Sequence, residues 1–192
     1  MVEHKSRVGT ALMVMHVQPP LTDMVEDDSW IERIADAIGA ARAADVLVIY
    51  VVVGYRAGYP EFPANDVRLQ QLEPGQLFIR GSSDAVHEKV ATRVGDIVVT
   101  TVRVSAFSGT DLEHILKSQN IDELVLTGIS TGGVVLGTLV GALDRDFRVT
   151  VLSDACADAN PSTHQALLDH FAAGAPWSAS VIPTQSWIQQ LA

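Results

Sequence analysis

Short apolar runs rich in valine, isoleucine and leucine alternate along this 192-residue chain with segments of helical spacing. The expected strands are residues 10–16, 46–53, 96–101, 124–127, 149–152 and 179–182. The expected helices are residues 28–44, 131–144, 160–173 and 185–191, and one more that a Thr110–Glu113 capping box opens. Strands that are apolar on both faces and separated by helices are typical of a mainly parallel sheet covered on both sides. This pattern predicts a three-layer α/β/α sandwich, formed as a single domain over residues 1–192.

The charge balance limits the classes of partner. The chain carries 23 acidic and 13 basic residues, for a net charge of −10, and has no basic run, which argues against nucleic acid or an anionic membrane. Its apolar runs are too short to span a bilayer, and the first ten residues lack the apolar segment of a signal peptide, so we expect a cytoplasmic protein. The single Cys156 and six scattered histidines predict no disulfide, no metal site and no cofactor.

In a parallel sheet the ligand lies beyond the carboxyl ends of the strands. The residues expected at those ends are His16, the loop after Val53, Thr101, the 128–134 turn and Asp154. Residues 54–85 are rich in glycine and proline and form the longest irregular segment, a kind of segment that often carries function. The sequence therefore predicts a binding or catalytic site at this edge.

Residues 128–132 spell G-x-S-x-G, the spacing of a serine hydrolase elbow. A strand, a turn and a helix surround Ser130, and Asp154 with His164 or His170 follows in the order of a Ser-Asp-His triad. However, Asp154 follows the very next strand, both histidines fall on an expected helix, and no oxyanion segment of the H-G-G-G type is present. A serine hydrolase is thus a minor alternative to glycines that serve a tight turn.

Three blocks of the chain, in order, resemble the isochorismatase-like hydrolases, also called the cysteine hydrolase superfamily. The first is "ALMVMHVQ", similar to the family's first strand and its D-x-Q. The second, "VRVSAFSGTDLEHIL", is similar to S-A-F-x-G-T-x-L. The third, "LVLTGISTGGVVLGT", resembles G-x-x-T-x-x-C-V-x-x-T and is followed by a "DACAD" element. The resemblance implies the α/β/α fold and a non-proline cis peptide at Ile129–Ser130.

The family's chemistry uses an Asp-Lys-Cys triad, and the resemblance places its three positions on His16, Thr101 and Val134. Valine has no lone pair, so acyl-enzyme chemistry at this position is excluded. His16 can act as an acid or a base, since imidazole titrates near neutrality, or it can be an inert hydrogen-bonded side chain. Thr101 is expected to make a local hydrogen bond. Cys156 lies in "DACAD", away from the nucleophile position, and is expected to be a small buried residue.

The expected contacts to a ligand surround these positions: Gln18, Tyr55, Arg56, Phe107 and Ser130, with the backbone N–H groups of Ser130 and Val134 as an oxyanion hole. One hypothesis is a hydrolase that acts on a small amide, urea or vinyl ether by non-covalent acid/base chemistry. The alternative is a catalytically inactive homologue that binds a small ligand or serves as an assembly subunit. The resemblance also implies a homo-oligomer, with residues 54–85, Trp30 and Trp177 as interface candidates.

Overall fold

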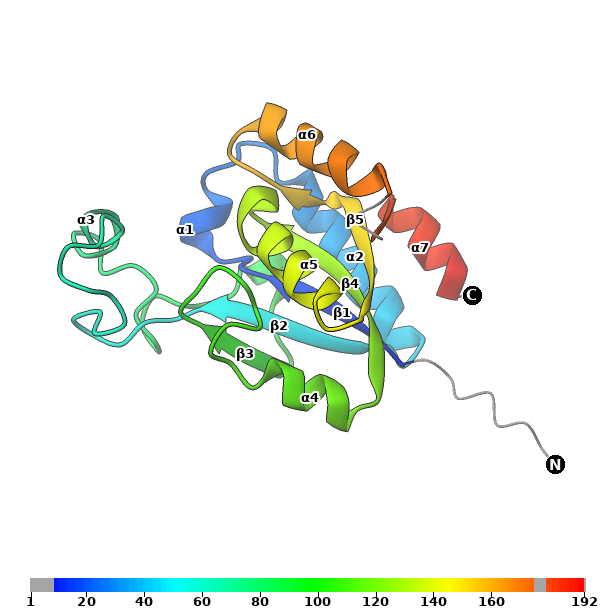
Figure 1. Cartoon of the computed structure of the whole chain (residues 1–192), viewed down its shortest axis with the longest axis horizontal. Helices are drawn as coiled ribbons and strands as arrows, with labels where there is room; N and C mark the ends of the chain where they lie inside the picture. Colours follow the sequence, from blue (N-terminus) through cyan, green and yellow to red (C-terminus); the bar gives the residue numbers. More distant parts are fainter. Residues whose placement is uncertain (1–8, 175–178, 192) are drawn as a thin grey trace.

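The computed structural model describes residues 9–174 and 179–191. Its strands are β1 (Gly9–Met15), β2 (Leu47–Val53), β3 (Ile97–Thr101), β4 (Ile121–Ile129), β5 (Arg148–Ala157) and β6 (Ala179–Ile182). These strands form one sheet in the order β3-β2-β1-β4-β5-β6, and every neighbouring pair is parallel (Figure 1). The predicted mainly parallel sheet is confirmed, and all its carboxyl ends lie at one edge.

Helices cover both faces of the sheet. The described α-helices are α1 (Pro19–Thr22), α2 (Ser29–Ala43), α3 (Leu69–Leu72), α4 (Leu112–Ser118), α5 (Leu136–Leu143), α6 (Pro161–Ala172) and α7 (Thr184–Leu191), and all but the short α1 and α3 form the two covering layers. Helices α2 and α7 pack in one apolar core, and α4, α5 and α6 pack in the core on the other face. The predicted three layers are therefore confirmed. That residues 1–192 are one domain stays a prediction.

The central strand β1 supplies both cores. Ala11, Met13 and Met15 contribute to the core beneath α4, α5 and α6, whereas Leu12 and Val14 contribute to the core beneath α2. Successive side chains of a strand point to opposite faces, so a strand covered on both faces is apolar at every position. This burial explains the near-continuous apolar sequence of β1.

The sequence predicted the start of α6 correctly and the start of α4 wrongly. Asn160 caps α6 as expected, because its side chain accepts hydrogen bonds from the N–H groups of Ser162 and Thr163. The Thr110–Glu113 capping box is wrong, since α4 starts after Asp111. The Thr110 hydroxyl donates instead to a main-chain carbonyl oxygen at 2.6 Å. Local turn contacts thus outcompete the capping pattern.

Residues 54–85, called the arm below, leave the end of β2 and extend beyond the carboxyl edge of the sheet (Figure 1). The arm contains α3 and most of an apolar cluster separate from the two sheet cores, in which Tyr55, Tyr59, Phe62 and Phe78 pack with Val53 at the end of β2. The expected interface residue Trp30 is 6% exposed and belongs to the core beneath α2, whereas Trp177 lies outside the described residues.

Candidate functional site

His16 follows the last residue of β1 in a left-handed backbone conformation, with φ at 57°. Its backbone N–H donates to the carbonyl oxygen of Val51 at 2.7 Å, and the residue is 6% exposed. The ring atom Nε2 is buried and has no hydrogen-bond partner among the described residues. Burial lowers the pKa of His16 to about 3, so the ring is neutral at physiological pH. The ring is therefore not an acid at that pH, and its unpartnered Nε2 is closed to solvent in this structure.

Thr101 ends β3, two strands away from His16 in the sheet. Its hydroxyl accepts a hydrogen bond from the N–H of Arg103 and donates one to the carbonyl oxygen of the same residue, both at 3.0 Å. The Thr101 side chain is therefore used to hold the chain after β3, and it carries no charge with which to replace a lysine.

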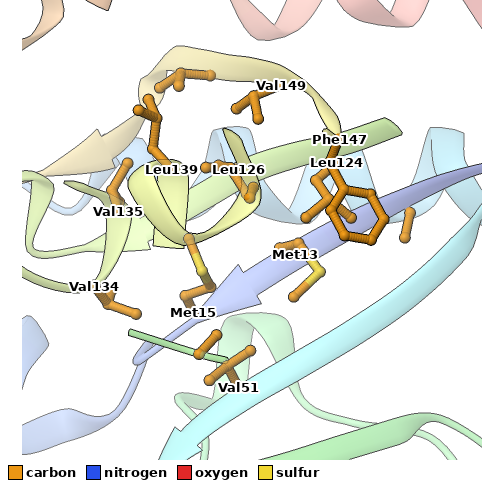
Figure 2. Packing of buried hydrophobic residues seen from close by; sticks show 14 of the residues in the cluster. Met13, Met15, Val51, Leu124, Leu126, Val134, Val135, Leu139, Phe147 and Val149 are labelled. Atoms are coloured by element: carbon orange, nitrogen blue, oxygen red, sulfur yellow. The ribbon is translucent and has the colours of Figure 1, made fainter. Parts of the chain in front are cut away.

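Val134 occupies the position where the resemblance places a nucleophile. It lies in a π-helical turn, Thr131–Val135, between β4 and α5, and is 1% exposed. Figure 2 shows Val134 in one apolar cluster with Met15 and Val51. An aliphatic side chain in an apolar core has no atom that can attack a carbonyl carbon, so the side chain at this position cannot form an acyl-enzyme.

The backbone of the turn has the expected cis peptide between Ile129 and Ser130. The carbonyl oxygen of Ser130 accepts hydrogen bonds from the N–H groups of Gly133 and Val135 at 3.1 and 3.2 Å. The N–H of Gly132 donates to a carboxylate oxygen of Asp158 at 2.8 Å. These three N–H groups are thus used within the protein, whereas the expected oxyanion hole of the Ser130 and Val134 N–H groups stays a prediction.

The Ser130 hydrolase alternative would need His164 or His170 between Ser130 and Asp154. The Nδ1 atom of His164 lies 2.8 Å from the hydroxyl of Thr131, the residue after Ser130. The carboxylate of Asp154 accepts hydrogen bonds from the N–H and hydroxyl of Thr184, both at 2.7 Å. His164 and Asp154 are therefore engaged elsewhere, and the structure shows no Ser-His-Asp relay through them.

Gln18 is fully buried and all its polar atoms bond to the main chain. Its amide nitrogen donates to the carbonyl oxygens of Val53 and Asp84, both at 3.0 Å. Its amide oxygen accepts the N–H of Val53 at 2.7 Å. Gln18 thus joins the two ends of the arm, and its amide hydrogens are not available to a ligand.

The other expected ligand contacts lie in two different places. Tyr55 packs in the arm cluster, with its ring centroid 5.0 Å from that of Phe62. The guanidinium of Arg56 is largely exposed and pairs with Glu61 at 2.9 Å. Phe107 instead belongs to the core beneath α4, α5 and α6, with its ring centroid 6.0 Å from that of another phenylalanine. Tyr55 and Phe107 therefore belong to different apolar clusters, and their contact with a ligand beside His16 stays a prediction.

Sequence reasoning did not identify the contacts of Asp158 and Arg103. The Arg103 guanidinium donates to the main-chain oxygen of Glu61 at 3.1 Å and lies over the Phe62 ring, 5.7 Å from its centroid, so it connects the arm to the end of β3. Asp158 is the last residue of "DACAD", and this position in a motif block was the only signal for it.

Two surface hollows lie away from His16, Thr101 and Val134. One of about 690 Å³ is at the opposite, amino edge of the sheet, where Gly9 and Ile121 begin their strands. The other, of about 330 Å³, is lined by residues of β5, α6 and β6, including Asp154 and His164. Neither hollow is lined by a residue at a triad-equivalent position, and those three side chains are buried.

We expect Cys156 to resist alkylation in the folded protein. Its thiol is buried, lies 3.7 Å from the carbonyl oxygen of Leu126, and has a pKa that burial raises to about 12. Little thiolate is present at neutral pH, and the thiolate is the reactive form. Intact mass after iodoacetamide treatment should show no adduct on native protein and one adduct in guanidinium chloride. Rapid, complete labelling of native protein would contradict this assignment.

We expect burial of neutral His16 to make the protein less stable as the pH falls. The folded pKa of about 3 lies below the ordinary value of 6.5, so this contribution is complete above pH 6.5 and is lost on acidification towards pH 3. The loss approaches about 1.4 kcal/mol per pH unit within that window. Urea denaturation from pH 7.5 to pH 4.5 measures it. His16→Asn is the control, because asparagine accepts a positive φ and does not titrate. Equal pH slopes in both proteins would show that His16 titrates normally.

Comparison with known proteins matches residues 10–185 to the family model described as the isochorismatase domain. Ureidoacrylate amidohydrolase RutB of Methylobacterium radiotolerans is 34% identical over 170 residues, which cover 81% of this chain and 66% of that protein. Maleamate amidohydrolase of Pseudomonas putida is 29% identical over 139 residues, which cover 72% and 64%. The chain thus spans less than two thirds of the length of these curated relatives.

Solved structures of isochorismatase-like proteins share the fold of this chain. The isochorismatase family protein of Desulfovibrio vulgaris superposes with a TM-score of 0.83 at 25% identity, over 96% of this chain and 98% of that one. The cysteine hydrolase of Pseudomonas syringae superposes with a TM-score of 0.81 at 24% identity, over 95% and 92%, and shows the shared fold. The domain match covers nearly the whole described structure, and its curated relatives are amidohydrolases. The chain belongs to the isochorismatase family.

Proposed function

We propose that this protein binds a small amide- or urea-type molecule at the carboxyl edge of its sheet and does not perform covalent hydrolysis. The observation that carries the proposal is the buried Val134 at the position of the family nucleophile. The other two triad positions also support the absence of covalent hydrolysis, because His16 is neutral and the hydroxyl of Thr101 bonds to the main chain. No buried charge is left unpaired at these positions, which removes the cost of a broken ion pair.

The ligand class comes from the relatives. Ureidoacrylate and maleamate, in the names of two curated relatives, both combine a urea or amide group with a carboxylate. A neutral imidazole with an unpartnered Nε2 suits hydrogen bonding to such an amide or urea group. Vinyl ether cleavage needs a proton donor, which a ring with a pKa of about 3 does not supply at neutral pH.

A second candidate is non-covalent hydrolysis, in which His16 is the base that takes a proton from water. The buried, unpartnered Nε2 favours this role, because it can accept a hydrogen bond from a water molecule beside a substrate. The low pKa opposes it, since general bases work best when their pKa lies near the operating pH. For this reason binding without turnover is the primary proposal.

One set of measurements separates the two candidates. Calorimetric titration with maleamate and with 3-ureidopropionate measures binding, and ammonia release with intact mass measures turnover and acylation. We expect heat of binding, no acyl adduct and no ammonia. Ammonia release that disappears in His16→Asn and persists in Cys156→Ala would favour the second candidate. Neither binding nor turnover across a panel of amides and ureas would overturn both.

A further inference from the structure

The hydroxyl of Thr131, at the start of the π-helical turn, is fully buried and makes two hydrogen bonds. It donates to the carbonyl oxygen of Ala157 at 3.1 Å and lies 2.8 Å from Nδ1 of His164. A hydroxyl has one proton and a carbonyl oxygen can only accept. Both contacts are therefore hydrogen bonds only when the hydroxyl donates to Ala157 and the Nδ1 atom of His164 donates to the hydroxyl oxygen, and we infer this tautomer. The bonds run in one direction, from His164 through Thr131 to Ala157.

Gly132, the next residue of the turn, is also held by contacts with the end of β5 and with α6. The N–H of Gly132 donates to Asp158 at 2.8 Å, and the other carboxylate oxygen of Asp158 accepts the N–H of Asn160 at 3.2 Å. A Cβ atom at Gly132 would lie 3.3 Å from the Asp158 carboxylate and 3.4 Å from the side chain of Leu167, so α6 packs closely on the turn. The first two residues of the turn are thus fixed by the end of β5 and the start of α6.

We infer that His164 is a positioning residue, which acts through Thr131 to hold the turn that follows Ser130 and carries Val134. The contacts of Thr131 lie outside the apolar cluster around Val134, so they add a polar anchor to one end of a turn whose other end is held by packing. The effect on ligand binding rests on the function proposed above, whereas the effect on the turn does not.

The direction of the hydrogen bond decides how the turn responds to pH. Burial lowers the pKa of His164, and the charge of Asp158 opposes that shift. Asp154 on β5 and Asp169 on α6 line the same hollow as the ring. Protonation below this pKa adds a proton at Nε2 and leaves the Nδ1–H donor in place. The anchor therefore survives acidification, whereas a ring that accepted the Thr131 proton at Nδ1 would lose its bond when protonated.

Nitrogen-15 NMR of labelled histidine tests the tautomer directly. At pH 7.5 we expect Nδ1 of His164 to carry the proton and Nε2 to be bare. Amide hydrogen exchange of Gly133 and Val135, which both bond to the carbonyl of Ser130, then tests the anchor. In His164→Phe their exchange should be about tenfold faster, the effect of losing one hydrogen bond. His164→Asn keeps a donor near Nδ1 and should restore most of the protection.

Gln165→Ala is the matched control, because it removes an exposed hydrogen bond to Asp169 on the same helix. If His164→Phe does not fold, Thr131→Val makes the same test. Unchanged exchange in either variant, or a proton on Nε2 in place of Nδ1, would overturn the inference.

Titration with maleamate follows in the same proteins. If exchange is faster in His164→Phe but the wild type does not bind maleamate, the proposed function alone is rejected. If the wild type binds maleamate but exchange in His164→Phe is unchanged, the positioning role alone is rejected.

Discussion

Alanine at Gly128 is expected to prevent folding, or to lower the free energy of unfolding by more than about 4 kcal/mol. Gly128 has a φ of 127°, which side chains of L residues rarely adopt. A Cβ atom there would lie 2.0 Å from the carbonyl oxygen of Met15 and 2.8 Å from its carbonyl carbon. Both atoms belong to the backbone of β1, which is paired on both sides and cannot move away. Soluble yield and urea denaturation measure the loss.

Gly81→Ala is the control for backbone strain without a clash. Gly81 has a φ of 76°, and a Cβ atom added there would meet no atom within 4 Å. This variant should fold and lose about 1–2 kcal/mol, the cost of a left-handed conformation. A similar loss in the two variants would show that the approach of β4 to β1 at Gly128 is looser than the structure indicates.

The second large effect is expected for Gln18→Glu, which keeps the shape of the side chain. The amide nitrogen of Gln18 faces the carbonyl oxygens of Val53 and Asp84. A carboxylate oxygen in its place would leave both carbonyls without a donor and would bury a charge against them. At pH 7.5 the free energy of unfolding should fall by about 3 kcal/mol or more. Urea denaturation measures it.

The sign of the pH dependence identifies the cause. Burial against two carbonyl oxygens raises the folded pKa of the new carboxyl above its unfolded value of about 4.3. The variant therefore keeps most of its stability below that pH and loses it as the pH rises through the folded pKa. Gln71→Glu, at an exposed position of α3 in the same arm, should show no such trend. A pH-independent loss in Gln18→Glu would point to altered packing.

Much of the fold followed from the sequence because each expected strand is a short run rich in apolar residues, although β4 and β5 extend well beyond the runs that predicted them. Periodicity does not report which strands pair, so the order β3-β2-β1-β4-β5-β6 came from the structure alone. The sequence predicted no element between the first strand, residues 10–16, and the helix that starts at residue 28. The structure shows a short helix there, α1, in which proline occupies a first helical position that needs no N–H donor.

The site was only partly predictable. The motif blocks located His16, Thr101 and Val134, because each sits at a fixed distance from recognisable neighbours in the sequence. The hydrogen-bond contacts of the Gln18 and His164 side chains could not be predicted, because their partners lie 66 and 33 residues away in the sequence. Expected ligand contacts can turn out to be structural anchors when their polar atoms meet main-chain groups that no local pattern reveals.

The arm has a consequence for how such a protein can change over time. Its apolar cluster is separate from both sheet cores, and Gln18 fastens its two ends at the points where it leaves and rejoins the body. Insertions or deletions between those ends leave the register of the six strands untouched, and longer loops cost little in closure entropy. Selection can therefore reshape the surface over the carboxyl edge by altering one contiguous stretch of the gene, while the sheet that presents it stays the same.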